Sequence, residues 1–105
     1  MTKFMLLYSG GGMPEEEEER NAIMAQWMAW YGAVGEAVVD GGNPFGASKS
    51  VTGAGVNDGP VSSPVSTGYT IISADSLDAA VALTKDHPHV KLGGQVSVYE
   101  TFDVM

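Results

Sequence analysis

The chain has 105 residues, enough for one compact domain of ordinary size, and we predict a single domain over residues 1–105. Its 13 acidic residues against 5 basic ones give a formal net charge of -8, which repels nucleic-acid phosphates and anionic membrane surfaces. The absence of cysteine excludes disulfides, thiolate metal sites and thiol nucleophiles. No apolar run reaches the length of a signal or membrane-spanning segment, so we expect a cytoplasmic protein without nucleic-acid or membrane partners.

The first predicted element is a β-strand over residues 3–9 with apolar side chains on both faces. Phe4, Leu6 and Tyr8 share one face, and Met5 and Leu7 share the other. We therefore expect both faces of this strand to be covered.

A long helix is predicted over about 14–39. Pro14 suits a first helical turn, and a run of glutamates follows it, 15–19. Apolar side chains then recur at the three- and four-residue spacing of a helix face that packs on a sheet: Ile23, Trp27, Trp30, Tyr31, Val34 and Val38. Gly41 and Gly42 should end the helix.

Residues 41–66 are rich in glycine, proline and serine, which predicts a loop-rich hairpin. Within it, a strand is favoured near 48–52, and the sequence Asn57-Asp58-Gly59-Pro60 favours a turn. The β-rich stretch 68–73 then predicts a strand.

The last third of the chain predicts a helix and a final strand. Asp75 or Ser76 should cap the helix, and His87-Pro88 should end it, because a residue before proline avoids helical geometry. Residues 95–103 alternate in the manner of a strand.

The order β-α-β-β-α-β predicts an α+β, ferredoxin-like fold, with both helices on one face of a four-stranded antiparallel sheet. The strands carry apolar residues on the helix-free face as well. The economical way to cover that face is a second copy of the chain, so we predict a homodimer.

The two histidines lie together in Asp86-His87-Pro88-His89, where a helix gives way to a loop. Imidazoles exchange protons near neutral pH, so His87 and His89 are candidate acid–base residues. A structural role at a helix end is the alternative. A metal site would need further ligands that the sequence does not mark, and we predict neither a metal nor a cofactor.

Four further residues are candidates for contact with a ligand, although core packing is the alternative for the aromatic ones. Trp27 and Tyr31 offer large flat surfaces, Tyr8 offers a hydroxyl for orientation, and Lys91 is the cation nearest to the histidines. Asp58 is a candidate catalytic carboxylate, whereas aspartate before glycine also suits a turn.

The glycine triplet 10–12 between strand and helix is superficially similar to a phosphate-binding loop. No Gly-Lys-Ser/Thr sequence follows it, and the glutamates at the helix start would repel phosphate. We interpret the triplet as a turn.

Nearly the whole chain resembles the YCII-related family, including its Asp-Gly-Pro-Phe branch. The resemblance rests on the order and spacing of short motifs: Met5-Leu6-Leu7-Tyr8, Met24-Ala25-Gln26-Trp27, Asn57-Asp58-Gly59-Pro60, Gly68-Tyr69-Thr70-Ile71-Ile72, Ser76-Leu77-Asp78-Ala79-Ala80, the His87-Pro88 step and the stretch 93–100. It implies a dimeric α/β barrel made of two ferredoxin-like units.

The resemblance also implies a direction for function. Some members of the family accompany alternative sigma factors, and a few are dehalogenating or lyase-type enzymes proposed to use a histidine–aspartate pair. This chain has no histidine near Ala25 and Gln26 on the first helix, has His87-Pro88 in place of an Asp-Pro step, and has Val61 in place of the phenylalanine. The proposed pair therefore does not transfer intact.

Three functional hypotheses remain. The first is a homodimer that binds a small organic molecule, with no reaction assigned; if it is an enzyme, we expect metal-free acid–base chemistry of the lyase or isomerase type. The second is a non-catalytic regulatory or protein-binding module, and the third, weaker one is a metal protein. An enzyme should have a partly polar pocket with a histidine pointing into it, whereas a module should have outward histidines and a filled interior.

Overall fold

The computed structural model describes residues 2–11, 14–61 and 65–103. Four strands form one antiparallel sheet in the order β2-β5-β1-β6, and two further strands form a separate hairpin. The sheet strands are β1 (Thr2–Gly10), β2 (Val38–Asp40), β5 (Ser66–Ala74) and β6 (Gly94–Glu100). The hairpin strands are β3 (Lys49–Thr52) and β4 (Gly55–Asp58). The α+β class and the four-stranded antiparallel sheet are as predicted, and they are compatible with a ferredoxin-like fold.

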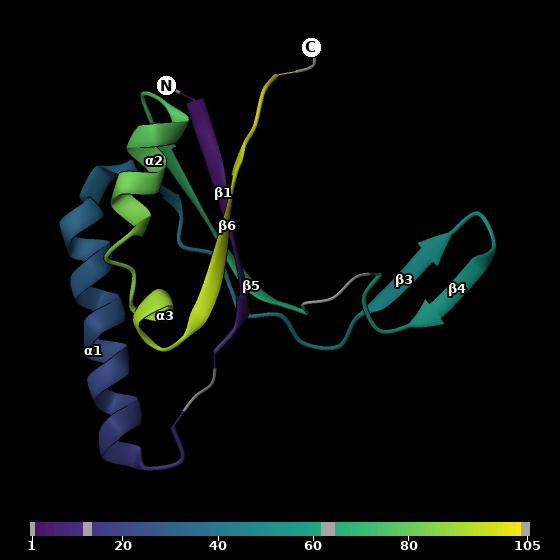
Figure 1. The fold of residues 1–105 in the computed structure, drawn as a ribbon, viewed down its shortest axis with the longest axis horizontal. Helices are drawn as coiled ribbons and strands as arrows, with labels where there is room; N and C mark the ends of the chain where they lie inside the picture. The colour runs from purple at the N-terminus through teal and green to yellow at the C-terminus, as the bar shows by residue number, and fades with distance from the viewer. Residues whose placement is uncertain (1, 12–13, 62–64, 104–105) are drawn as a thin grey trace.

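The helices α1 (Glu17–Val34), α2 (Leu77–Thr84) and α3 (Pro88–Lys91) all lie on one side of the sheet (Figure 1). Beneath them, alternate residues of the two central strands are fully buried, with Phe4 and Leu6 on β1 and Ile72 on β5. Trp30 of α1 and Ala80 of α2 complete this core from above. Among the described residues, no helix has the length and apolar character needed to span a membrane.

The prediction that the first helix continues to about residue 39 is wrong at its C-terminal end. Gly35 takes a left-handed backbone (φ 62°), and its N–H bonds to the Tyr31 carbonyl, which closes α1. A short 3₁₀ helix, η1 (Gly35–Ala37), then turns the chain into β2, where Val38 pairs with Ile72. Val38, the last residue of the apolar stripe predicted for the helix, therefore belongs to the sheet.

The predicted strand near residue 48 exists, but it does not belong to the main sheet. β3 pairs only with β4, in register from Lys49↔Asp58 to Thr52↔Gly55. Asn57 and Asp58 consequently lie in a strand, and the turn that we predicted around them lies at 53–54 instead. Figure 1 shows this hairpin projecting from the side of the sheet opposite to the helices.

The region around the histidines also differs from the prediction. α2 begins as expected, with the Ser76 hydroxyl accepting a bond from the Ala79 N–H at 3.1 Å, but it ends at Thr84 rather than at His87. His87 is the N-cap of α3, and Pro88 occupies its first turn. The final strand ends at Glu100, short of the predicted residue 103.

Candidate functional site

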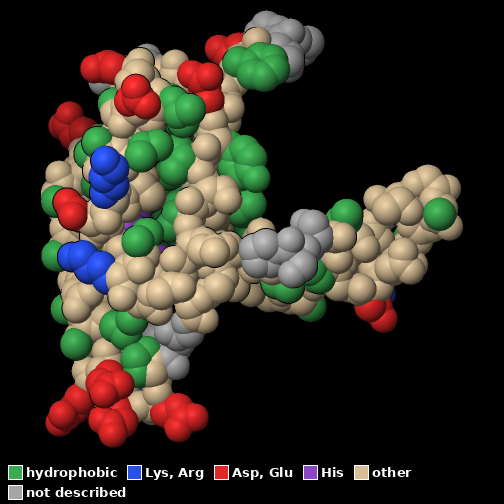
Figure 2. Space-filling view, viewed as in Figure 1, with side chains coloured by type: hydrophobic (Ala, Val, Ile, Leu, Met, Phe, Trp, Pro, Cys, Tyr) green, Lys and Arg blue, Asp and Glu red, His purple; other side chains and the backbone are tan. Residues whose placement is uncertain are grey.

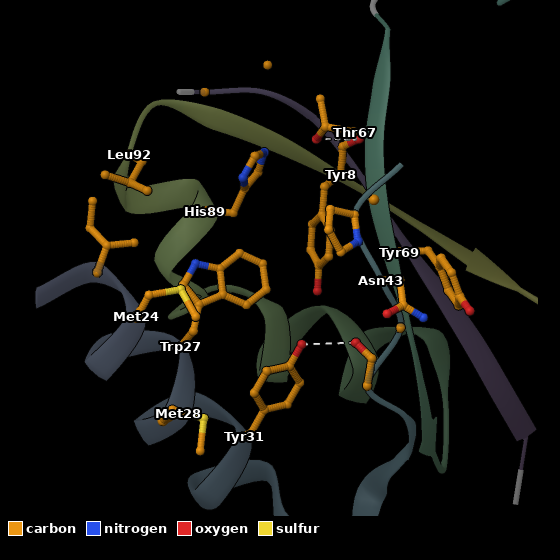
Figure 3. Close-up of a pocket in the computed structure, with 17 residues that line it drawn as sticks. Tyr8, Met24, Trp27, Met28, Tyr31, Asn43, Thr67, Tyr69, His89 and Leu92 are labelled. Carbon is orange, nitrogen blue, oxygen red and sulfur yellow. Dashed lines mark hydrogen bonds between the residues drawn. The ribbon is translucent and has the colours of Figure 1, made fainter. Parts of the chain in front are cut away.

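A cavity of about 490 Å³ opens between α1, the helix-covered side of the sheet and the loop after β2. Figure 3 shows Trp27 and Tyr31 on α1, with Tyr8 of β1 and His89 of α3 around the same space. The lining is mostly apolar and consists of Tyr8, Gly10, Gly11, Ile23, Met24, Trp27, Met28, Tyr31, Gly41, Gly42, Asn43, Pro44, Thr67, Gly68, Tyr69, His89 and Leu92. A few polar atoms in such a wall are what a small-molecule site requires.

A directed chain of hydrogen bonds runs through the core beside this cavity. The backbone N–H of His89 donates to Nδ1 of His87 at 3.0 Å, so the proton of a neutral His87 ring resides on Nε2. Nε2 lies 2.9 Å from the Tyr8 hydroxyl and donates to it. Tyr8 in turn donates to Oγ1 of Thr70 at 2.6 Å, and Thr70 donates to the Gly41 carbonyl at 3.1 Å.

His87 is completely buried among aromatic rings. The centroid of its ring lies 4.4 Å from that of Trp30, 4.5 Å from that of Trp27 and 4.9 Å from that of Tyr8. Burial lowers the pKa of His87 to about 4, and the charge of His89 acts in the same direction. His87 is therefore neutral at pH 7, and both of its ring nitrogens already have partners.

Tyr8 is held in its neutral form by the same surroundings. Burial raises the pKa of the Tyr8 phenol above its usual range; the hydrogen bond with Thr70 acts against this shift, and the charge of Tyr31 acts with it. The Tyr31 hydroxyl lies at the edge of this network, where it donates to the Gly41 carbonyl at 3.0 Å.

His89 differs from His87 because, among the described residues, only one of its two ring nitrogens has a hydrogen-bond partner. Nε2 of His89 lies 2.8 Å from the Ser9 carbonyl, which can only accept, so Nε2 carries a proton. Within the described residues, every buried side-chain nitrogen or oxygen has a hydrogen-bond partner. Nδ1 of His89 has none among these residues, so this atom is not buried. The His89 side chain lines the cavity.

Glycines make room for this imidazole. A Cβ at Gly94 would lie 2.3 Å from Nε2 of His89, and a Cβ at Gly11 would lie 3.1 Å from Cε1. Gly10 and Gly11 also have left-handed backbones (φ 67° and 68°), which glycine adopts without strain. Gly12, the third residue of the predicted turn, lies outside the described residues.

The structure brings together five of the seven candidates from the sequence: His87, His89, Tyr8, Trp27 and Tyr31. Asp58 lies on the projecting hairpin, where its carboxylate is 3.3 Å from the Lys49 ammonium and its side chain is 93% exposed. Lys91 is exposed on α3 and is not part of the cavity lining. Among the described residues, no group of three histidine, aspartate or glutamate side chains converges as a metal site would require.

Thr70 and Gly94 were missed by the sequence analysis. Thr70 is a buried polar residue among the inward-facing side chains of β5, and this position is the signal that would have identified it. Gly94 carries no such signal, because the atoms that require a glycine belong to His89, which precedes the turn into β6.

Comparisons with known proteins inform the fold. No family model matches the chain, and no curated protein sequence matches it. Among solved structures, it is similar to 5-chloro-2-hydroxyhydroquinone dehydrochlorinase from Burkholderia phenoliruptrix AC1100, determined in complex with 2,5-dihydroxybenzoquinone. The two share 18% identity with a TM-score of 0.55, and the match covers 95% of this chain and 93% of that one. At this level of identity the similarity shows a common fold.

Proposed function

We propose that the cavity binds a small organic molecule with a flat, hydroxylated ring and that His89 exchanges a proton with it. The aromatic faces of Trp27 and Tyr31 suit a flat ring, and the Tyr31 hydroxyl and His89 offer polar contacts at the edge of the cavity. The bound 2,5-dihydroxybenzoquinone of the structural neighbour is a molecule of this class, which supports the choice of ligand.

The observation that carries the proposal is the arrangement of the His89 ring. The Ser9 carbonyl fixes the proton on Nε2, and this leaves the lone pair of Nδ1 available to a molecule in the cavity. An imidazole that donates one N–H to a backbone carbonyl keeps its other nitrogen as a proton acceptor, which is the arrangement of a general base.

The proposed step moves one proton and needs no co-reactant. Nδ1 of His89 accepts a proton from a hydroxyl or an acidified carbon of the ligand, and the electron pair of the broken bond enters the conjugated ring. The imidazolium that results returns the proton to another atom of the ligand, which is isomerisation, or to a departing group, which is elimination.

We assign His87 a positioning role in this scheme. Its pKa of about 4 keeps it neutral, and its nitrogens are bonded to the His89 backbone and to Tyr8. His87 therefore fixes the start of α3, from which the His89 side chain extends, and it sets the direction of the Tyr8 hydroxyl.

The test uses 2,5-dihydroxybenzoquinone as the probe. Titration into the protein should quench tryptophan fluorescence, because Trp27 lines the cavity, and the protein should accelerate exchange of the ring hydrogens of the probe in D₂O, followed by NMR. We expect His89→Gln, which retains an amide donor for Ser9, to bind the probe within about threefold of wild type and to lose at least tenfold of the exchange rate.

Asp78→Asn, on the exposed surface of α2, is the matched control and should leave both measurements unchanged. Binding without any accelerated exchange would reduce the proposal to a ligand-binding protein. Exchange that persists in His89→Gln would remove His89 from the step.

We also propose that the functional unit is a homodimer, in which the helix-free face of each sheet covers that of the other to form an α/β barrel. We define this face by Met5, Leu7, Tyr69, Ile71 and Tyr99, whose positions alternate with those beneath the helices. Tyr99 is 53% exposed in the single chain, and apolar area of this kind is normally covered. A cytoplasmic location remains a prediction from composition.

The non-catalytic module is the less favoured alternative. Its interior should be filled and both of its histidines should face outward. A cavity with an accessible histidine nitrogen in its wall supports the binding of a small molecule instead.

A further inference from the structure

The hairpin β3–β4, residues Lys49–Asp58, forms an arm that has few contacts with the other described elements of the chain. Within the described residues, β3 and β4 make their substantial contacts only with each other. The radius of gyration is 15.2 Å, whereas about 13 Å is usual for a compact chain of this length. An isolated two-stranded hairpin is at best marginally stable in water, so the arm needs a surface to lie on.

One face of the arm has the composition of a contact surface. Val51 pairs with Val56, and their side chains are 74% and 63% exposed. Next to them on the same face, Lys49 and Asp58 form an ion pair, so this face combines an apolar pair with an ion pair and carries no net charge. A cross-strand valine pair that stays exposed to water contributes little to folding. Burial of the two side chains against a partner would remove their apolar surface from water and stabilise the complex.

The direction of the arm indicates the partner. The arm extends on the helix-free side of the sheet, and apolar side chains lie on the side of the sheet that faces it (Figures 1 and 2). At the base of the arm, Phe45 stacks on Tyr69 of the helix-free face at a centroid distance of 5.9 Å. Phe45 therefore joins the base of the arm to the edge of this face.

Charge favours a second copy of the chain as the occupant. The chain carries a net charge of -8, and Figure 2 shows its acidic side chains gathered mainly at the two ends of the helical layer. On β1, β5 and β6 the strand positions of the helix-free face hold no acidic residue, and Lys3 of β1 belongs to the same face. The one acidic strand residue that pairs with this face among the described residues is Asp40 of the edge strand β2, opposite Ile71. Two copies can meet there with less charge repulsion than at their acidic ends. A two-fold axis would place the arm of each chain against the other chain and bring the two helix-free faces together.

We propose that the arm of each chain clasps the other chain of the dimer, with Val51 and Val56 buried against the partner's body. This inference rests on the homodimer proposed above. It adds to that proposal the element that extends the interface beyond the sheet.

The primary test measures the dimer dissociation constant by sedimentation over a dilution series. We expect Val51→Ser with Val56→Ser to weaken the dimer at least tenfold. Val81→Ser, an exposed valine on α2, is the matched control and should change it less than twofold. Unchanged dimerisation of the double variant would overturn the clasp.

A second variant removes the arm without disturbing the sheet. The Gly59 N–H bonds to the Ser48 carbonyl at 3.0 Å, so an Asn-Gly turn can replace residues 49–58 and join the two ends. We expect a folded protein with at least a hundredfold weaker dimer. A folded armless protein that dimerises like wild type contradicts the clasp even if the double variant is unstable.

Crosslinking identifies what the arm touches. Because the chain has no cysteine, Val56→Cys provides a single thiol for a benzophenone label. Mixed with isotopically labelled chains, it should crosslink between chains to the body of the partner, and crosslinks confined to one chain would refute the clasp. A wild-type monomer would overturn both the dimer and the clasp, whereas a dimer sensitive to Tyr99→Asp but not to arm variants would overturn the clasp alone.

Discussion

Two histidines that are equivalent in the sequence have different surroundings in the structure. The pair is separated by one proline, yet His87 is enclosed by aromatic rings and His89 lines the cavity. The sequence Asp86-His87-Pro88-His89 identifies the place where chemistry is expected. It does not identify which imidazole retains a free nitrogen, because the partners that decide this, Tyr8 and Ser9, lie about eighty residues away in the chain.

The buried His87 makes the stability of the protein depend on pH. Its pKa is about 4 in the folded state, against about 6.5 in an unfolded chain, so the unfolded state binds the extra proton between these values. Stability should fall as the pH drops from 6.5 towards 4, by about 2 kcal/mol at pH 5, and should level off below pH 4.

Urea unfolding at pH 8 and pH 5 measures this loss. His87→Asn retains an acceptor for the His89 N–H but has no group that titrates in this range, so its stability should change by about 2 kcal/mol less between the two pH values. Equal losses in wild type and variant would mean that His87 is not the titrating group.

Gly94 should be intolerant of any side chain, because the His89 ring occupies the space of its Cβ. Gly94→Ala must displace the imidazole from the Ser9 carbonyl, at a cost of about 1–3 kcal/mol in unfolding free energy. The NMR signal of the His89 ring should shift, and exchange of the ring hydrogens of the probe should slow at least tenfold.

Gly32→Ala is the matched control, since nothing lies within 4 Å of its Cβ position on α1. It should stabilise the helix by up to about 1 kcal/mol and leave the His89 signal in place. Equal behaviour of the two alanine variants would contradict a packing role for Gly94.

At the scale of elements, the sequence predicted those whose ends have local signals. The runs that form β1 and β5 are rich in residues that favour strands, and the Ser76 cap sets the start of α2. The end of α1 was missed because the apolar stripe continues through Val34 into Val38, and only pairing with β5 assigns Val38 to the sheet. The C-terminal end of α1 is therefore set by the pairing of Val38 with β5, and the positive φ of Gly35 allows the chain to leave the helix there.

The cap of α2 gives a prediction at this scale. Ser76→Ala removes the oxygen that accepts the Ala79 N–H, and should lower the unfolding free energy by about 1 kcal/mol. Ser76→Asp keeps an acceptor and should retain most of the stability. Urea midpoints at neutral pH measure both, and an alanine variant as stable as wild type would show that the cap contributes nothing.

At the scale of the whole molecule, the sequence indicated that one face of the sheet needs a cover and predicted a loop-rich hairpin over 41–66, but it did not show that this hairpin projects from the sheet as an arm. Residues 41–66 have the composition of a loop, and glycines and prolines do not show that the chain runs outward and returns as a ribbon. The cavity lies between α1, the sheet and the loop that joins β2 to the arm, and the side chains that line it meet only in the folded chain.

The proposed dimer predicts that thermal stability depends on protein concentration. When unfolding also separates two chains, a higher concentration favours the folded dimer and raises Tm. Tyr99→Asp places a charge on the helix-free face, on the edge strand β6, so it should abolish this dependence while the far-ultraviolet circular dichroism at low temperature stays that of wild type. Val90→Asp, exposed on α3 at the helical side, should retain the dependence. A wild-type Tm that is constant over a hundredfold range of concentration would mean that the sheet face is exposed in a monomer, and the arm would then have no second chain to hold.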